Sequence, residues 1–158
     1  MIKMNEEKYE QLRLESQLCF PLYACARMVV NKYTPYLRPL GLTYTHYIVF
    51  MALWENDGMT VGDLGRRLYL DAGTLSPVLK KLENEGYINR TRFKLDERVV
   101  LITLTKKGWD MREKVKDIPF CLAKSCTLSE QEMATVYGIL YKMLDENERS
   151  GNDERTAE

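Results

Sequence analysis

The residues with the widest chemical range are the four cysteines, Cys19, Cys25, Cys121 and Cys126, and the single histidine, His46. No two cysteines form a CxxC pair, and the histidine completes no spacing typical of zinc ligands, so we expect no metal and no cofactor. The first residues lack the apolar core of a signal peptide, which favours a cytoplasmic location and argues against permanent disulfides. Reversible thiol chemistry is compatible with this pattern.

A second group of residues could contact nucleic acid. The formal net charge is +0, so a uniformly basic surface is excluded and any contact with DNA must come from local clustering of charge. A basic cluster does exist, and acidic residues concentrated after Lys142 offset its contribution to the net charge. Its members are Arg90, Arg92, Lys94 and Arg98.

Two short helices and a hairpin must position these basic residues. Val61 to Tyr69 has apolar residues at helical spacing, and a second helix is predicted between Asp71, an acceptable N-cap, and Gly86, which suits the position after a helix end. The composition then becomes strand-like over residues 87–93 and 98–104. This order predicts a fold of the α+β class, mostly α, with a winged helix-turn-helix DNA-binding domain over residues 43–105.

Helical patterns also lie on either side of this domain. A long helix is predicted from Glu6 to about Lys32, with a kink or a new start near Cys19 because Pro21 lacks a backbone N–H. The segment 34–42 contains two prolines and a glycine and is predicted to be a connection. A mainly apolar central helix follows over residues 43–55.

The flanking helices are expected to hold two copies of the chain together. Residues 1–42 and 106–149 are predicted to form a helical dimerisation region, because their amphipathic helices flank a domain that has a core of its own. Ser129 and Glu132 form a capping-box pattern before the last helix, and residues 150–158 are expected to be a disordered tail. A two-fold homodimer would place two recognition helices about one turn of a palindromic double-stranded DNA apart.

The first half of the second motif helix would face base edges and phosphates. Arg98 is the predicted minor-groove insertion, oriented by Asp96 through an ion pair. The alternative is that the motif mediates protein contacts and that these charges form an ordinary solvated surface. The predicted contacts from the helix are Gly73, Thr74, Ser76, Pro77, Lys80 and Lys81.

Two segments resemble one family of regulators. Residues 68–105, including the DER sequence of the wing at Asp96 to Arg98, resemble the recognition helix and wing of MarR-type transcriptional regulators. Residues 17–55 are similar to the branch formed by the organic hydroperoxide resistance regulators and related thiol-based regulators. The resemblance covers roughly residues 14–148.

The resemblance implies a sensor thiol at Cys19, in the sequence LCF, supported by hydroxyls of Tyr33 and Tyr44 from the partner subunit. A sensor must react as a thiolate, which such donors or a helix N-terminus stabilise. From the residues alone, a lone cysteine such as Cys19 on an apolar helix face is more often a small buried hydrophobe, and the tyrosines could be ordinary core residues. Branch members finish the reaction with a low-molecular-weight thiol or a second cysteine, for which Cys126 and Cys121 are candidates. Cys25 is a poor one, since it lies ~9 Å from Cys19 along a helix.

Three hypotheses for function follow. The first is a dimeric repressor that organic hydroperoxides or related oxidants release from its operator through oxidation of Cys19. The second keeps DNA binding but makes a small phenolic or aromatic ligand the signal. The third, a thiol peroxidase-like enzyme, is disfavoured because no phosphate loop, paired catalytic carboxylates or Ser/His/Asp set accompanies the cysteine. No membrane contact is expected, because the longest apolar run, residues 47–54, is too short to span a bilayer.

Overall fold

The computed structural model describes the backbone of residues 6–93 and 96–155 and the side chains of residues 9–93 and 99–146. Its contacts divide the chain into two compact units, Met1–Leu122 and Ala123–Glu158, which are described separately below. The helices are α1 (Cys19–Leu37), α2 (Tyr44–Glu55), α3 (Val61–Leu68), α4 (Ala72–Asn84), α5 (Lys106–Val115), α6 (Ile118–Ala123) and α7 (Glu130–Arg155), with 3-10 helices η1 (Glu6–Leu12), η2 (Leu14–Ser16) and η3 (Arg38–Leu40).

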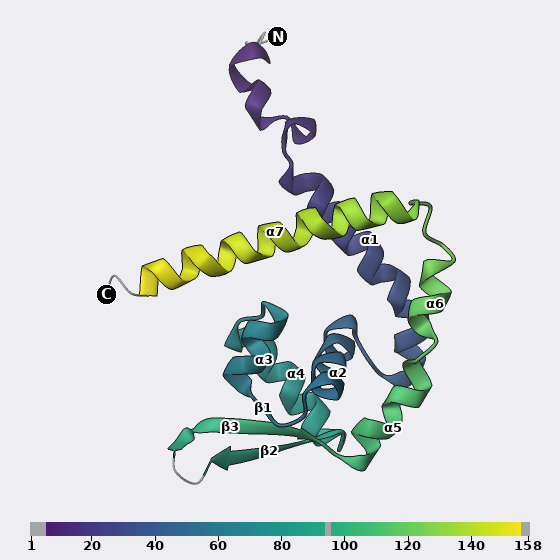
Figure 1. The fold of residues 1–158 in the computed structure, drawn as a ribbon, viewed down its shortest axis with the longest axis vertical. Coiled ribbons are helices and arrows are strands. Elements are labelled where there is room, and N and C mark those ends of the chain that lie inside the picture. The colour runs from purple at the N-terminus through teal and green to yellow at the C-terminus, as the bar shows by residue number, and fades with distance from the viewer. Residues whose placement is uncertain (1–5, 94–95, 156–158) are drawn as a thin grey trace, which may run out of the picture. The chain divides into compact units, whose positions relative to one another are not determined.

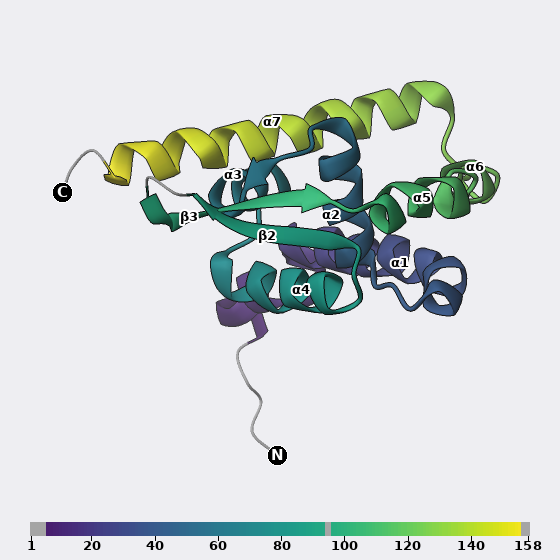
Figure 2. The ribbon, with the colours of Figure 1, turned by 90° about the horizontal axis from the view of Figure 1, so that it is seen from below.

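A winged helix-turn-helix forms the centre of the first unit, as predicted. Strands β1 (Met59–Thr60), β2 (Ile88–Phe93) and β3 (Asp96–Leu104) make an antiparallel sheet in the order β1-β3-β2. Helices α2, α3 and α4 gather beside this sheet, and the β2–β3 hairpin reaches away from them (Figures 1 and 2). The register pairs Ile88 with Leu104 at the base of the hairpin, and it shifts between Arg92 and Phe93. The short β1 was not predicted from the sequence.

The core of the first unit joins the three helices to the sheet. Phe50 is fully buried, stacks on Trp54 with ring centroids 5.3 Å apart, and meets the edge of Tyr87 at 5.5 Å. Leu37 from α1 and Val115 from α5 are also buried in this core. The predicted separation of residues 1–42 and 106–149 from the winged domain is therefore incomplete, because parts of both flanks pack into its core.

The N-terminal segment differs from the prediction. The predicted α-helix is wrong for the residues before Cys19, where the 3-10 helices η1 and η2 lie, but the predicted new start near Cys19 is confirmed. Pro21 occupies the third position of α1, where a backbone N–H would have no partner within the helix. The predicted connection over residues 34–42 is also wrong at its start, because α1 continues through Pro35 to Leu37, whose burial anchors the last turn.

The second unit consists mainly of the long helix α7. Ser129 and Glu132 form the predicted capping box, in which the Ser129 N–H donates to the Glu132 carboxylate at 2.8 Å and the Ser129 hydroxyl accepts from the Glu132 N–H. The helix extends to Arg155, so residues 150–155 of the predicted disordered tail are helical. Residues 156–158 lie outside the described part of the chain. Within the described residues, no helix is both long and apolar enough to cross a membrane.

Candidate nucleic-acid interface and redox site

Helix α4 presents a polar surface because its apolar side is fixed in the core. Leu75, Leu79 and Leu82 are fully buried at helical spacing. Asp71 caps the helix by accepting the Thr74 N–H at 2.8 Å. All six residues predicted to face DNA from this helix are exposed, namely Gly73, Thr74, Ser76, Pro77, Lys80 and Lys81.

Two of these six side chains already have partners. The Thr74 hydroxyl donates to the Asp71 carboxylate at 2.8 Å, so its hydrogen is not available to a phosphate oxygen in this state. These hydrogen bonds from Thr74 lower the pKa of Asp71, which keeps the cap ionised. Lys81 lies 3.9 Å from Glu85 in an exposed ion pair, which is weak enough for an anion to compete.

The wing residues divide into three groups. Arg92 is exposed near the end of β2, as predicted. Arg90 is half-buried with its guanidinium 3.7 Å from the Glu83 carboxylate, so its first partner lies in this chain rather than in DNA. Lys94 lies outside the described residues, as do the side chains of Asp96 and Arg98, although the backbone of the last two belongs to β3.

A basic pair on α3, the first helix of the motif, was not predicted from the sequence. Arg66 is exposed and pairs with Asp63, whose pKa is lowered chiefly by the hydrogen bond from the Thr60 hydroxyl. Arg67 lies 2.8 Å from Glu55 in an exposed pair. The first helix of such a motif crosses the DNA backbone, so two adjacent arginines in this helix were the signal available.

Cys19 lies at the first position of α1 and its side chain is exposed. The N–H groups of the first turn point toward the N-terminal end, where the partial positive charge of the helix stabilises an anion. The Cys19 sulfur lies 4.0 Å from the Gln17 side-chain oxygen. The Cys19 thiol is therefore accessible to a peroxide, and it donates to an acceptor of its own chain.

Three tyrosines cluster where α1 packs on α2. The Tyr33 ring lies 4.8 Å from Tyr44 and 5.6 Å from Tyr47, measured between centroids. Burial raises the pKa of each of the three hydroxyls, which therefore keep their protons and can donate hydrogen bonds. Tyr47 was missed from the sequence, although its i, i+3 spacing from Tyr44 places both on one side of α2.

Within one chain, Cys19 cannot meet the tyrosine cluster. Cys19 and Tyr33 are fourteen positions apart on the continuous helix α1, which is about 21 Å at ~1.5 Å per residue. A tyrosine side chain does not span that length. The structure therefore brings Tyr33 and Tyr44 together but leaves Cys19 apart from them.

The remaining cysteines are also exposed thiols. Cys25 is six positions from Cys19 on α1, ~9 Å along the axis, so a disulfide between them would require the helix to break. Cys121 lies on α6, and Cys126 precedes α7 with its sulfur 3.8 Å from that of Met133. Among the described residues, no three His, Cys, Asp or Glu side chains gather in a way that could hold a metal ion.

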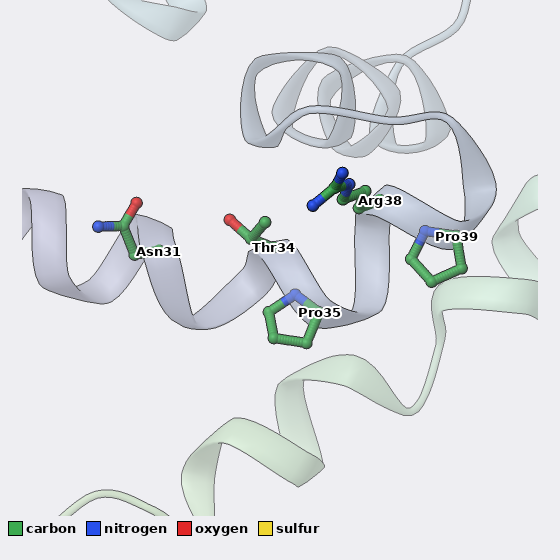
Figure 3. Close-up of a pocket in the computed structure, with 5 residues that line it drawn as sticks. All are labelled: Asn31, Thr34, Pro35, Arg38 and Pro39. Atoms are coloured by element: carbon green, nitrogen blue, oxygen red, sulfur yellow. The ribbon is translucent and has the colours of Figure 1, made fainter.

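Two hollows lie near the C-terminal end of α1. An open depression surrounds Thr34 and Arg38, whose side chains lie on the same side of the chain (Figure 3). A smaller cavity of about 360 Å³ lies between this end of α1 and the start of α2. The cavity is lined by Val30, Thr34, Leu37, Arg38, Leu42, Thr43, Tyr44 and Thr45.

The buried histidine is expected to make the stability of the first unit depend on pH. Nδ1 of His46 accepts the Thr43 N–H at 3.0 Å, closing the N-cap of α2. Burial lowers the pKa of His46 from its usual 6.5. The positive charge of Lys81 lowers this pKa further by a smaller amount, and the negative charge of Glu85 opposes both effects.

We expect the free energy of unfolding to fall as the pH drops below 6.5. The unfolded chain binds a proton at His46 first, so stability is full above that value and is lost by at most ~1.4 kcal/mol per pH unit below it. Chemical denaturation of wild type and His46→Gln between pH 7.5 and 5.5 tests this, because glutamine keeps an acceptor for Thr43. If the free energy of unfolding depended on pH equally in the two proteins, His46 would not be the group responsible.

Comparison with known proteins identifies relatives along most of the chain. Residues 31–118 match the family model described as Transcriptional regulator SarA/Rot. The organic hydroperoxide resistance transcriptional regulator of Bacillus subtilis is 41% identical over 140 residues, covering 89% of this chain and 95% of that protein.

Solved structures agree with this relationship. One of them is the structure of overoxidised AbfR bound to DNA, which is 36% identical with a TM-score of 0.71 and covers 88% of this chain and 98% of that one. A further structure is that of AbfR of Staphylococcus epidermidis. AbfR with a disulfide formed is 34% identical with a TM-score of 0.60, covering 89% and 99%. These relatives are regulators rather than enzymes, which removes the peroxidase hypothesis. The chain belongs to the MarR and SarA/Rot family of winged-helix, DNA-binding transcriptional regulators, beside the organic hydroperoxide resistance regulator.

Proposed function

We propose that this protein is a dimeric repressor that releases its operator when an organic hydroperoxide oxidises Cys19. The observation that carries the proposal is the exposed thiol at the N-terminal end of α1, in a chain 41% identical to an organic hydroperoxide resistance regulator. The exposed surface of α4 would enter the major groove, with the hairpin as the wing.

A second copy of the chain is needed for two reasons. Cys19 and Tyr33 are too far apart on one helix to interact, so a tyrosine hydroxyl that supports the thiolate must come from a partner. In addition, Leu18, the N-cap of α1, is 70% exposed and Met28 within α1 is 64% exposed, and α7 exposes Tyr137 at 63% and Ile139 at 55%. Helices with so much exposed apolar surface are expected to pack against another chain.

The proposed oxidation has two balanced steps. The Cys19 thiolate attacks the hydroperoxide, the O–O bond breaks, and with one proton the products are a sulfenic acid and an alcohol. A second thiol then displaces water from the sulfenic acid and forms a disulfide. Cys126 and Cys121 of the partner subunit, or a low-molecular-weight thiol, are the candidates for that second thiol.

The second step is the one proposed to release DNA. AbfR has been solved bound to DNA in both its reduced and its overoxidised forms, so overoxidation by itself is compatible with DNA binding in that relative. A disulfide between subunits would instead alter the spacing of the two recognition helices. Losing one half-site removes the gain from bivalent binding, which is worth about 100-fold or more in affinity.

A second candidate signal is a small phenolic or aromatic acid. The cavity between α1 and α2 has a mainly apolar lining to which Arg38 and Tyr44 also contribute, and these residue types suit a ring bearing a carboxylate. Such a ligand would bind beside the tyrosine cluster without any change at Cys19.

One experiment separates the two signals. The reduced protein is used to select a palindromic duplex from a random-sequence pool, and its affinity is measured after addition of cumene hydroperoxide or of salicylate. We expect cumene hydroperoxide to weaken binding by about 100-fold, dithiothreitol to restore it, and salicylate to have no effect. Release by salicylate alone would favour the ligand hypothesis and contradict ours.

A further inference from the structure

The turn that ends α4 is held by residues of α5. Gly86 has a φ of 72° and allows the Tyr87 N–H to return to the Leu82 carbonyl at 2.9 Å, which closes the helix. The turn contains three backbone carbonyls, those of Glu85, Gly86 and Tyr87. Each of the three accepts a hydrogen bond from the first residues of the α5 segment.

Thr105 and Lys107 provide these bonds. The Thr105 hydroxyl lies 2.7 Å from the Gly86 oxygen, and the Thr105 N–H donates to the Tyr87 oxygen at 3.0 Å. The Lys107 ammonium lies 2.7 Å from the Glu85 oxygen and 4.3 Å from the centre of the Tyr87 ring. A cation at this place also interacts favourably with the negative end of the α4 dipole.

We propose that Lys107 is a positioning residue that fixes the orientation of α4 relative to α5, and through it the fit of α4 to DNA. The inference rests on the proposed role of α4 as the recognition helix. Lys107 lies beyond the C-terminal end of α4, whereas the residues proposed to face DNA lie within the helix, from Gly73 to Lys81. Its contribution is therefore to geometry, and its charge is directed to a carbonyl of its own chain.

The neighbouring lysine provides a matched control. Lys106 carries the same charge and starts the same helix, but its side chain is 93% exposed and pairs only weakly with Asp110 at 3.8 Å. Lys107→Met and Lys106→Met thus remove equal charge from the same surface, and only the first removes the bond to Glu85. Lys107→Arg keeps a donor and a cation at the carbonyl.

The test measures affinity for a duplex selected by the wild-type protein and for a random-sequence duplex of equal length. We expect Lys107→Met to bind the selected duplex about three- to tenfold more weakly, as for one lost hydrogen bond, with unchanged affinity for the random duplex. Lys106→Met and Lys107→Arg should stay within about twofold of wild type. Hydrogen exchange at the Gly86 and Tyr87 amides should be faster only in Lys107→Met.

Three results would overturn the proposal. The first is wild-type affinity of Lys107→Met for the selected duplex. The second is a salt dependence of binding reduced by about one ion in Lys107→Met, which would make Lys107 a phosphate contact. The third is an equal loss on both duplexes together with a lower melting temperature, which would indicate general destabilisation. Failure of the wild-type protein to select any duplex would instead contradict the proposed function itself.

Discussion

Replacement of Cys19 by serine should make DNA binding insensitive to hydroperoxide. The Cys19→Ser protein should bind the selected duplex as the reduced wild type does, because the side chain is exposed and no part of the core. Cumene hydroperoxide should then cause no release, whereas the wild type should lose about 100-fold in affinity. Gel-shift titrations with and without oxidant measure both quantities.

Cys25→Ser is the matched control, because Cys25 is an exposed thiol on the same helix. It should respond to oxidant like the wild type. Non-reducing electrophoresis of the oxidised protein adds the identity of the second thiol: a covalent dimer that disappears in Cys126→Ser identifies Cys126, and one that disappears in Cys121→Ser identifies Cys121. A Cys19→Ser protein that still releases DNA on oxidation would show that the sensor lies elsewhere.

Gly108→Ala should strongly lower the free energy of unfolding of the protein. A Cβ at this position would lie 2.3 Å from the Tyr87 carbonyl oxygen and 2.9 Å from the Leu104 side chain. Tyr87 cannot move easily, because its oxygen accepts from Thr105, and the Gly108 oxygen is fixed by the Trp54 indole N–H at 3.1 Å. We expect a loss of about 3 kcal/mol in the free energy of unfolding.

This expected loss of stability is opposite to the change that helix propensity alone would give. Alanine in place of a helical glycine normally stabilises by about 1 kcal/mol, so the overlap with backbone must outweigh that gain. Gly62→Ala in α3 is the control, since its Cβ would meet only atoms at ordinary contact distances of 3.8 Å. Urea denaturation should show Gly62→Ala at or above wild-type stability. A Gly108→Ala protein of equal or higher stability would disprove the close approach.

The elements that could be predicted from the sequence are those set by neighbouring residues. Asp71 caps α4, Gly86 ends it, and the Ser129–Glu132 capping box begins α7, because each of these contacts spans only a few residues. The helical spacing of Leu75, Leu79 and Leu82 in the sequence likewise matches the buried side of α4. The resemblance in residues 17–55 and 68–105 then led to the correct family.

The contacts that only the tertiary structure determines join residues that are far apart in the chain. The lysine at 107 meets the carbonyl at 85, and Trp54 meets Gly108, across 22 and 54 positions that no local pattern connects. Burial of Leu37 carries α1 through Pro35, against the local preference of proline.

The same distinction applies to the cysteines, the tyrosines and the basic residues. Their types predicted thiol and DNA chemistry, but only the folded chain shows that Arg90 faces Glu83 and that Tyr47 joins Tyr33 and Tyr44. The length of α1 likewise keeps Cys19 from the tyrosines of its own chain. Residue types and short spacings are properties of the sequence, whereas the distances between such groups are set by the packing of whole helices.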